Sequence, residues 1–267
     1  MVKVRWHAAF VAFLVFALGA LLPGCGGTGP ANVAGQGTKE LTVFAAAALM
    51  DVLPEHGRAF EASTGVRVKF CFGATGDLAR QLKEGAPADL FFSSSREWTE
   101  KTESWDLLSG RSVLVATNGL ACIVSANNPT KAKGPSDLQW PEFKRIAICD
   151  ENVPAGKYAR EALRHYNLLK LLGPRFVGQK DVRAALNSVG QGDLDIGFVY
   201  DTDAPADTRV RTLFVFDPRS HTMVEHLGAP VKASGELASA RRFLDFVRSP
   251  KGQAIFKNRG FGPGDAP

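Results

Sequence analysis

Hydrogen-bond donors gather at the ends of apolar runs in this sequence, where they could bind an anion. Thr75 lies between glycines in "GATGD", so its hydroxyl and its backbone N–H could both donate. Tyr200 ends the run "DIGFVY" with a phenol that could also donate. Ala155 in "VPAG" and Val182 in "KDVR" fall in the first turn of helical patterns, where backbone N–H groups have no partner inside the helix. Together, such donors can bind a small oxyanion without a positively charged side chain.

A further turn of this kind offers only methyl groups. The stretch "LTVFAAAALMDV" (41–52) runs from a strand pattern into a helical pattern through four alanines, the last of which is Ala48. Alanine keeps its backbone N–H, so the turn can still donate, but it brings no hydroxyl. Taken singly, each of these features has a plainer interpretation as a turn, a helix start or a close contact between helix and sheet. The interpretation as an anion site depends on their combination.

Motifs of an enzyme or of a cation site are absent from the sequence. There is no G-x-S-x-G, H-E-x-x-H or P-loop, and no histidine adjoins a serine or cysteine motif. Asp201 and Asp203 could ligate a metal, but we interpret them as part of a solvated loop. Cys71, Cys122 and Cys149 lie in apolar strand-like runs, which indicates buried free thiols; one disulfide stays open as an alternative. We therefore predict no catalytic residue, no cofactor and no cation site.

Strand and helix patterns alternate along the chain. Alternation of this kind predicts an α/β fold with largely parallel sheets, in which ligands bind beyond the carboxyl ends of the strands. The expected strands are 41–47, 66–72, 88–94, 112–117, 120–126, 144–149, 195–200, 212–216 and 229–233. The expected helices are 49–64, 76–85, 96–108, 155–172, 181–192 and 236–258.

The beginning of the chain has the pattern of a secretory signal peptide. Two basic residues precede an apolar run of about 15 residues (8–22), and small residues follow around Cys25. A membrane-spanning helix is the alternative, but it needs roughly 20 apolar residues. "LLPGC" resembles the lipobox of bacterial lipoproteins, so we expect Cys25 to carry a lipid; ordinary cleavage and release is the alternative. The glycine-rich stretch 25–39 is typical of a flexible tether.

The charge of the chain is mildly positive. The formal net charge is +5, and no basic run is longer than a pair. This distribution gives no indication of a nucleic-acid surface.

Several longer stretches carry a more specific pattern. They are "TVFAAAAL", "FGATGDLARQLKEGAPADLFFS", "VPAGKYAREAL", "DVRAAL", "GFVYDTDA" and "RRFLDFVRSPKGQAIFKNRGF". Together they resemble the periplasmic molybdate-binding proteins of ABC importers, which have the type II periplasmic binding protein fold. The resemblance covers nearly all of residues 41–261. It implies two α/β lobes, each with a mostly parallel sheet flanked by helices, that close over a ligand cleft.

The resemblance also implies a ligand shell for molybdate or tungstate. Thr75 would donate its hydroxyl and N–H, Ala155 and Val182 would donate N–H groups, and Tyr200 would donate its hydroxyl. Ala48 stands where the family has a serine, so one hydroxyl is missing. A different oxyanion or a small acid is therefore an alternative ligand. We expect Lys157 and Arg183, which adjoin this shell in sequence, to point outward.

The resemblance further implies an exported protein that delivers its ligand to a membrane permease. We expect a monomer in the periplasm, anchored to the membrane through Cys25 and without a nucleic-acid partner. The effector half of a transcription regulator shares the lobe architecture, but a signal peptide in place of a DNA-binding segment argues against it. The expected division is signal peptide 1–24, tether 25–39, lobe 1 in two parts at 40–117 and 226–261, lobe 2 at 118–225, and disordered tail 262–267.

Overall fold

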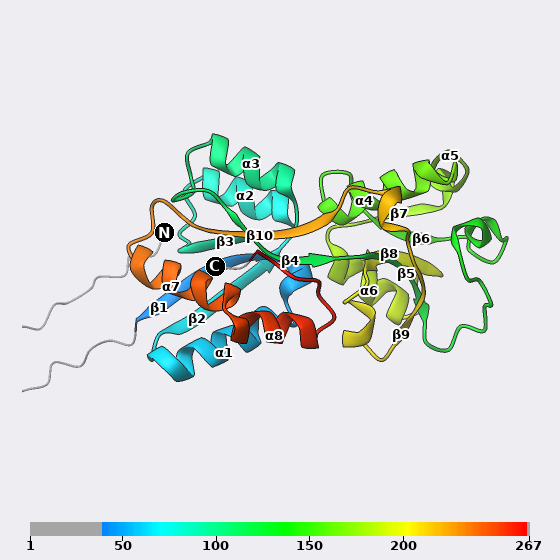
Figure 1. Ribbon diagram of the computed structural model, residues 1–267. Helices are drawn as coiled ribbons and strands as arrows, with labels where there is room; N and C mark the ends of the chain where they lie inside the picture. Colours follow the sequence, from blue (N-terminus) through cyan, green and yellow to red (C-terminus); the bar gives the residue numbers. More distant parts are fainter. Residues whose placement is uncertain (1–38, 266–267) are drawn as a thin grey trace, which may run out of the picture. The chain divides into compact units, whose positions relative to one another are not determined.

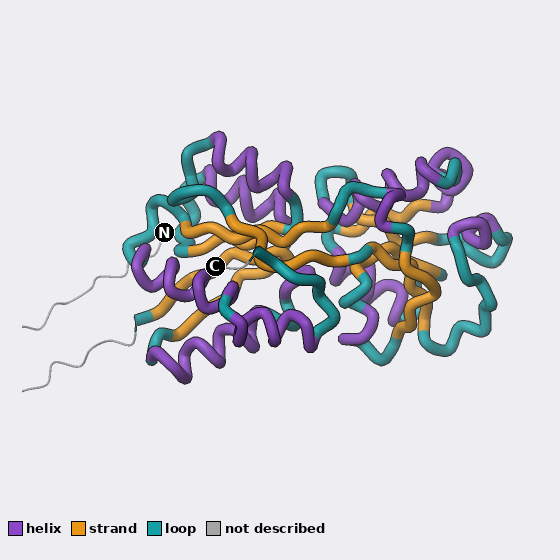
Figure 2. Tube along the Cα trace, viewed as in Figure 1, coloured by secondary structure: helices purple, strands orange, loops and turns teal. Residues whose placement is uncertain are grey.

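The structure is a computed structural model that describes residues 39–265 (Figure 1). The predicted signal peptide, Cys25 and the predicted tether up to residue 38 lie outside the described residues. Within 39–265, no helix is long and apolar enough to cross a membrane. Strands and helices alternate along the chain, as the sequence predicts (Figure 2).

Lobe 1 is built on a five-stranded sheet with the order β2-β1-β3-β10-β4. Figure 1 shows α2 and α3 on one face of this sheet and α1, α7 and α8 on the other. The strands are β1 (Glu40–Ala46), β2 (Arg67–Gly73), β3 (Leu90–Ser93), β4 (Val113–Asn118) and β10 (Val224–Pro230). The helices are α1 (Leu53–Thr64), α2 (Thr75–Lys83), α3 (Arg96–Ser104), α7 (Leu237–Arg248) and α8 (Pro250–Asn258), with the 3-10 turn η1 (Ala47–Leu49) after β1.

Lobe 2 is built on a second five-stranded sheet with the order β7-β6-β8-β5-β9. Helices α4 and α6 both pack against it. The strands are β5 (Leu120–Ser125), β6 (Ile146–Cys149), β7 (Phe176–Gln179), β8 (Ile196–Tyr200) and β9 (Val210–Val215). The helices are α4 (Pro154–His165), α5 (Leu169–Leu172) and α6 (Val182–Gly190), with 3-10 turns η2 (Pro135–Gln139), η3 (Gly173–Arg175), η4 (Ala204–Ala206) and η5 (Pro218–Ser220).

Each sheet is mixed, with one strand reversed. In lobe 1 the reversed strand is β10, which pairs antiparallel with β3 and β4. In lobe 2 it is β5, which pairs antiparallel with β8 and β9. The other strands of each sheet share one direction, but two of the four strand pairs in each sheet are antiparallel. The predicted two-lobe α/β fold is confirmed, with mixed sheets in place of the expected mostly parallel ones. The chain passes from one lobe to the other between β4 and β5 and returns between β9 and β10.

The buried cores follow the sheets. One cluster of buried apolar side chains lies between the lobe 1 sheet and α1, α7 and α8, and another lies under α2. The lobe 2 core is a single cluster, and it includes Ala47 and Ala48, which come from the turn after β1. Ala47 and Ala48, the second half of the alanine run, therefore pack against the other lobe. This contact joins the two lobes at the point where the sequence predicts a ligand.

Several expected elements differ from the observed ones. The expected helix 155–172 is broken between α4 and α5, where Asn167 has a positive φ of 59°. The expected helix 236–258 is broken at Ser249, whose side chain accepts from the Gly252 N–H and starts α8. The expected helix 49–64 begins only at Leu53, one residue before Pro54, which is favoured in the first helical turn. The expected strand 229–233 is β10, which begins earlier, at Val224.

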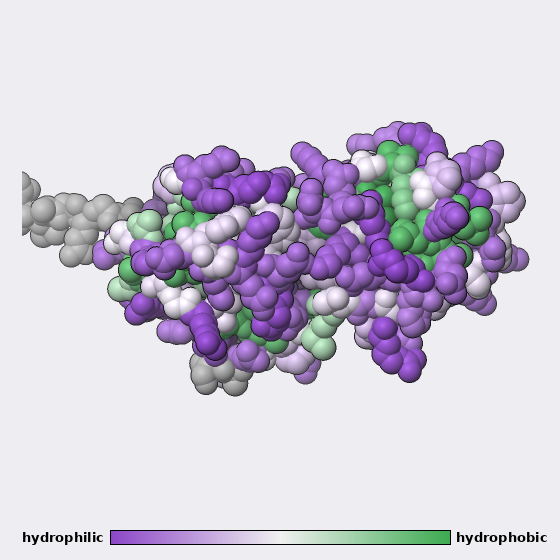
Figure 3. All heavy atoms as spheres, turned by 90° about the horizontal axis from the view of Figure 1, so that it is seen from above, coloured by the Kyte–Doolittle hydropathy of each residue, from purple (hydrophilic) through white to green (hydrophobic). Residues whose placement is uncertain are grey.

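Two further expectations are wrong: the burial of Cys71 and the disorder of residues 262–265. Cys122 and Cys149 are buried free thiols, but Cys71 is exposed because it lies on β2, the edge strand of its sheet. Residues 262–265, which belong to the expected disordered tail, are ordered. The Gly262 N–H donates to the Thr117 carbonyl, and the Asp265 N–H donates to the Leu114 carbonyl. The face shown in Figure 3 is covered mainly by hydrophilic side chains, with smaller patches of hydrophobic ones.

Candidate functional site

All five residues predicted to bind the anion line one pocket. Ala48 and Thr75 come from lobe 1, and Ala155, Val182 and Tyr200 come from lobe 2. The pocket is small, with a cavity volume of about 20 Å³. The remaining lining residues are Ala46, Ala47, Gly73, Ala74, Ser94, Val153, Pro154 and Asp181. Among the described residues, no lysine or arginine lines it.

Three α-helices begin at this pocket, and their first N–H groups are available to a ligand. The residues before α2 and α4, Ala74 and Val153, supply no side-chain hydrogen bond to the helix start. Asp181 before α6 accepts from the Ala184 N–H, which leaves the N–H of Val182. The first N–H groups of a helix have no intrahelical partner, and the helix dipole is positive at this end. The convergence of these helix starts favours a negatively charged ligand.

Thr75 presents a hydroxyl whose hydrogen has no acceptor in the described part of the chain. The residue is 1% exposed, and its Oγ1 accepts a hydrogen bond of 3.2 Å from the Ser94 N–H. A hydroxyl that accepts in this way still has its own hydrogen to donate. The bond to Ser94 therefore positions the hydroxyl without consuming the donor that a ligand needs.

Tyr200 presents a second hydroxyl at the end of β8. The residue is 2% exposed, and its backbone N–H donates to Asp203 Oδ2 at 2.9 Å. Its phenol has no hydrogen-bond partner among the described residues, and burial raises the pKa of the phenol well above its ordinary value. The phenol therefore keeps its proton and can donate it to a ligand.

Ser94 also lines the pocket, in addition to the five predicted ligand residues. It belongs to the run Ser93–Ser95, whose hydroxyls are the alternative source of the hydrogen bond that Ala48 lacks. Its Oγ lies 2.9 Å from His226 Nδ1. Burial lowers the pKa of His226 to about 3, so the ring is neutral and carries one N–H. The Asn118 amide nitrogen, which donates to Thr202, lies 3.5 Å from His226 Nε2. From this neighbour we assign Nε2 as the acceptor and infer that Nδ1 donates to Ser94. The Ser94 hydroxyl hydrogen is thus left for the pocket.

The signal for Ser94 was present in the sequence. It is the last residue of the expected strand 88–94 and directly follows the observed β3, so the rule that selected Tyr200, a hydroxyl at a strand end, applies to it as well. Its partner could not be found in this way, because His226 is 132 residues distant along the chain.

The two basic residues beside the shell behave differently. Lys157 forms an exposed ion pair with Glu97 of lobe 1, so it points away from the pocket as expected. The expectation for Arg183 is wrong: its side chain is only 15% exposed and lies against Ala47 and Asp51 of lobe 1. Arg183 turns inward toward two carboxylates, Asp51 of lobe 1 and the fully buried Asp203 of lobe 2.

The interpretation of Asp203 as part of a solvated loop is also wrong. Asp203 is fully buried, beside Arg183 and the N–H of Tyr200. Desolvation raises the pKa of its carboxyl to about 6, while the Arg183 charge acts in the opposite direction. Within 39–265, no group of three or more His, Cys, Asp or Glu side chains is arranged to hold a metal ion.

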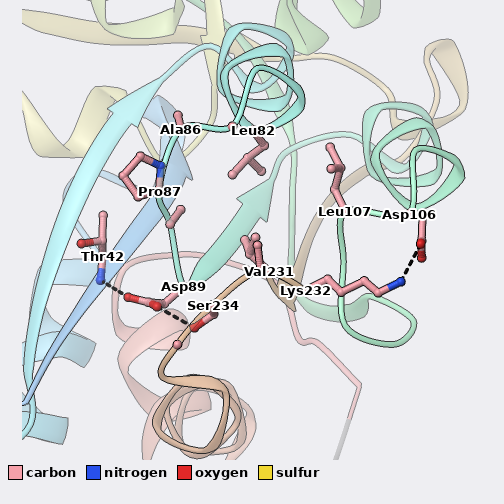
Figure 4. A pocket seen from close by; sticks show the side chains of 14 residues that line it. Thr42, Leu82, Ala86, Pro87, Asp89, Asp106, Leu107, Val231, Lys232 and Ser234 are labelled. Carbon is pink, nitrogen blue, oxygen red and sulfur yellow. Dashed lines mark hydrogen bonds and ion pairs between the residues drawn. The ribbon is translucent and has the colours of Figure 1, made fainter.

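A second cavity lies away from the five predicted residues (Figure 4). It is lined by the segment "GAPAD" (85–89) and by residues after β10. Asp89 accepts there from the Thr42 N–H at 2.7 Å and from the Ser234 hydroxyl at 2.6 Å, as Figure 4 shows. These bonds tie β1, β3 and the segment before α7 together, which gives this family-like motif a structural role.

The fold and the pocket define a class of protein. Two α/β lobes are connected by two chain crossings, and helix starts from both lobes converge on a small pocket suited to an anion. The chain belongs to the bacterial extracellular solute-binding proteins, a family whose sequence profile matches residues 41–262.

Particular members of this class are similar to the chain. It is 33% identical to the molybdate-binding protein ModA of Escherichia coli (strain K12) over 83% of this chain and 88% of that protein. It is 29% identical to the putative ABC transporter substrate-binding lipoprotein YvgL of Bacillus subtilis (strain 168), over 95% of each chain. The solved periplasmic molybdate-binding protein of Azotobacter vinelandii superposes with a TM-score of 0.76 at 25% identity, covering 83% of this chain and 98% of that one.

Proposed function

We propose that the protein binds molybdate or tungstate between its two lobes and delivers the anion to the membrane permease of an ABC importer. The observation that carries this proposal is the single pocket in which Ala48, Thr75, Ala155, Val182 and Tyr200 meet without a cationic side chain. The names of the relatives, molybdate-binding and ABC transporter substrate-binding proteins, support the ligand and the transport role.

The proposed shell consists of N–H and O–H donors from both lobes. Ala48, Thr75, Ala155 and Val182 would donate backbone N–H groups, and Thr75 and Tyr200 would donate hydroxyls. We add Ser94 as a sixth member, because its free hydroxyl hydrogen can supply the bond that Ala48 lacks. The lobes, with boundaries near residues 118 and 225, would close to complete this shell and exclude water.

A different oxyanion or a small acid is the second candidate ligand. The observation that favours it is the methyl group of Ala48, which lines the pocket and leaves a different pattern of donors on this side. Molybdate, tungstate, sulfate and phosphate all present tetrahedral oxygens, so the donor positions and the pocket size would decide among them.

The contact between Ser94 and His226 also raises catalysis as a candidate. A serine hydroxyl 2.9 Å from an imidazole nitrogen has the spacing of a nucleophile and its base. A base works best with a pKa near the working pH, and burial lowers the pKa of His226 to about 3. We therefore propose that the pair has a binding role. A covalent serine-hydrolase probe that labels Ser94 would contradict this.

We further propose that the protein is exported and anchored to the membrane through a lipid on Cys25. The lipobox-like "LLPGC" and the lipoprotein name of the Bacillus relative support the anchor. We expect a monomer that needs no cofactor.

Calorimetric titration of the purified mature protein tests the function. Molybdate, tungstate, sulfate and phosphate are added in separate runs under the same salt conditions. We expect molybdate and tungstate to bind more tightly than sulfate and phosphate. Binding of a different anion class alone would select the second candidate, and binding of none would contradict the proposal.

A further inference from the structure

Arg183 connects the two lobes beside the pocket without lining it. It belongs to α6 of lobe 2, and its Nε donates to the Ala47 carbonyl of lobe 1 at 3.2 Å. Its Nη2 lies 2.6 Å from Asp51 Oδ2 of lobe 1 and 3.2 Å from Asp203 Oδ1 of lobe 2. We call Arg183, Asp51 and Asp203 the Arg183 cluster.

One oxygen of each carboxylate in the cluster has Arg183 as its partner. Asp51 Oδ2 and Asp203 Oδ1 are buried and receive no hydrogen bond from another described residue. Asp203 is fully buried, and a buried charge is unfavourable unless it is paired. The cluster is therefore an ion network in which two acids from different lobes share one cation.

The cluster also touches the elements that carry the proposed ligand donors. Val182, Ala48 and Tyr200 belong to these elements: Val182 precedes Arg183 in the chain, and Ala48 follows Ala47, whose carbonyl Arg183 binds. Asp203 holds the backbone N–H of Tyr200. Three of the proposed ligand residues are thus fixed relative to one another by Arg183 and Asp203, two side chains that do not line the pocket.

We propose that Arg183 is a positioning residue that stabilises the closed arrangement of the lobes over the anion. This proposal builds on the proposed function. The contacts with Asp51 and the Ala47 carbonyl join two lobes, so they are lost when the lobes separate. The contact with Asp203 lies within lobe 2 and is kept. A contact present only in the closed state shifts the equilibrium toward that state and raises the affinity for any ligand that requires closure.

The chain offers a matched comparison on another side of the pocket. Lys157 and Glu97 form an ion pair between the same two lobes, but their side chains are 46% and 67% exposed. The side chains of Arg183 and Asp51 are 15% and 39% exposed. Exposed pairs contribute little because solvent screens them. Glu97→Gln therefore serves as the control for Asp51→Asn.

The test measures anion affinity and release rate in Asp51→Asn, Arg183→Gln, the double variant and the Glu97→Gln control. Asp51→Asn is the main variant, because removal of Arg183 also leaves buried Asp203 unpaired and can impair folding. We expect Asp51→Asn to weaken molybdate and tungstate binding by the same factor, about 3- to 10-fold, mainly through faster release. We expect the double variant to lose little more than Arg183→Gln alone, and Glu97→Gln to change affinity less than about twofold.

Other results contradict the proposal in a recognisable way. Unchanged affinity and release in Asp51→Asn, or losses that add fully in the double variant, would overturn it. Different factors for the two anions would indicate that the cluster acts on the pocket itself. If the wild-type protein binds none of the anions, the proposed function fails. Small-angle X-ray scattering without anion then decides: a less compact Asp51→Asn supports the cluster as a closing device, and identical curves reject it.

Discussion

Two substitutions in the pocket, Ser94→Ala and Ala48→Ser, test whether the Ser94 hydroxyl supplies the hydrogen bond that Ala48 lacks. Ser94→Ala removes a hydroxyl that lines the pocket and whose hydrogen is left free by the His226 Nδ1–H. A hydrogen bond to a charged group contributes about 1.5–3 kcal/mol, so the loss predicts about 10- to 100-fold weaker anion binding. A water that enters the space would reduce this effect.

The complementary change adds a hydroxyl to the other side. Ala48 is 3% exposed and lines the same pocket, so Ala48→Ser places a donor there with one added atom. In the wild-type background we expect a gain of at most about tenfold, because Ser94 already supplies a donor. In the Ser94→Ala background we expect Ala48→Ser to recover most of the lost affinity. The difference between the two gains is the measure of compensation.

Isothermal titration calorimetry with molybdate is carried out on the wild type, Ser94→Ala, Ala48→Ser and the double variant. The four affinities complete a double-mutant cycle. Melting temperatures without anion control for damage to the fold, since the His226 ring loses its acceptor in Ser94→Ala. Wild-type affinity in Ser94→Ala would refute the reasoning about the free hydroxyl. Weaker binding in Ala48→Ser would mean that the pocket is shaped around the methyl group, and the molybdate proposal would then fail.

Three further predictions follow from the site and the chain ends. Thr75→Ala and Tyr200→Phe should each weaken anion binding about 10- to 100-fold in the same titration, whereas Thr75→Ser, which keeps the hydroxyl, should change it little. Tyr200→Phe should leave the melting temperature nearly unchanged, because the phenol has no partner among the described residues. Cys25→Ala should move the protein from the membrane to the soluble fraction of cells, and unchanged fractionation would reject the lipid anchor. The folded-state pKa of His226 is about 3, below its ordinary 6.5, so unfolding takes up a proton between these values and stability falls as pH falls through this window. Between pH 6.5 and 4.5, the free energy of unfolding should therefore fall by about 2–3 kcal/mol less in His226→Gln than in the wild type. The raised pKa of Asp203 acts in the opposite direction on stability, and it does so in both proteins. Equal losses would contradict a buried neutral His226.

The sequence predicts the arrangement of the fold where the pattern is local. The alternation of strands and helices places the turns before α2, α4 and α6 correctly, because apolar periodicity and helix starts are short-range signals. The break before Leu169 is harder to predict, because it depends on the left-handed conformation of Asn167 inside an apolar pattern that continues on both sides. The expected strand 229–233 has the wrong start, because β10 is defined by pairing with β3 and β4, which are distant in sequence.

The site shows the same division between local and long-range information. Thr75, Ala155, Val182 and Tyr200 could be selected because each marks the end of an element. The inward direction of Arg183 could not, since its partner carbonyl at Ala47 lies 136 residues earlier. Asp203 lies in a polar loop by sequence and is fully buried in the fold, because the loop turns back under the end of β8. Whether a charged side chain near a predicted site points inward or outward can thus be decided only from the tertiary structure.

A crystal structure of the mature protein with bound molybdate tests the central claim most directly, namely that the anion is held by neutral donors from both lobes. We predict the anion between Ala48, Thr75, Ala155, Val182 and Tyr200, with its oxygens about 2.7–3.2 Å from their N–H and O–H groups. We also predict that no lysine or arginine nitrogen contacts it. An anion bound elsewhere, or one paired directly with Arg183, would contradict the account.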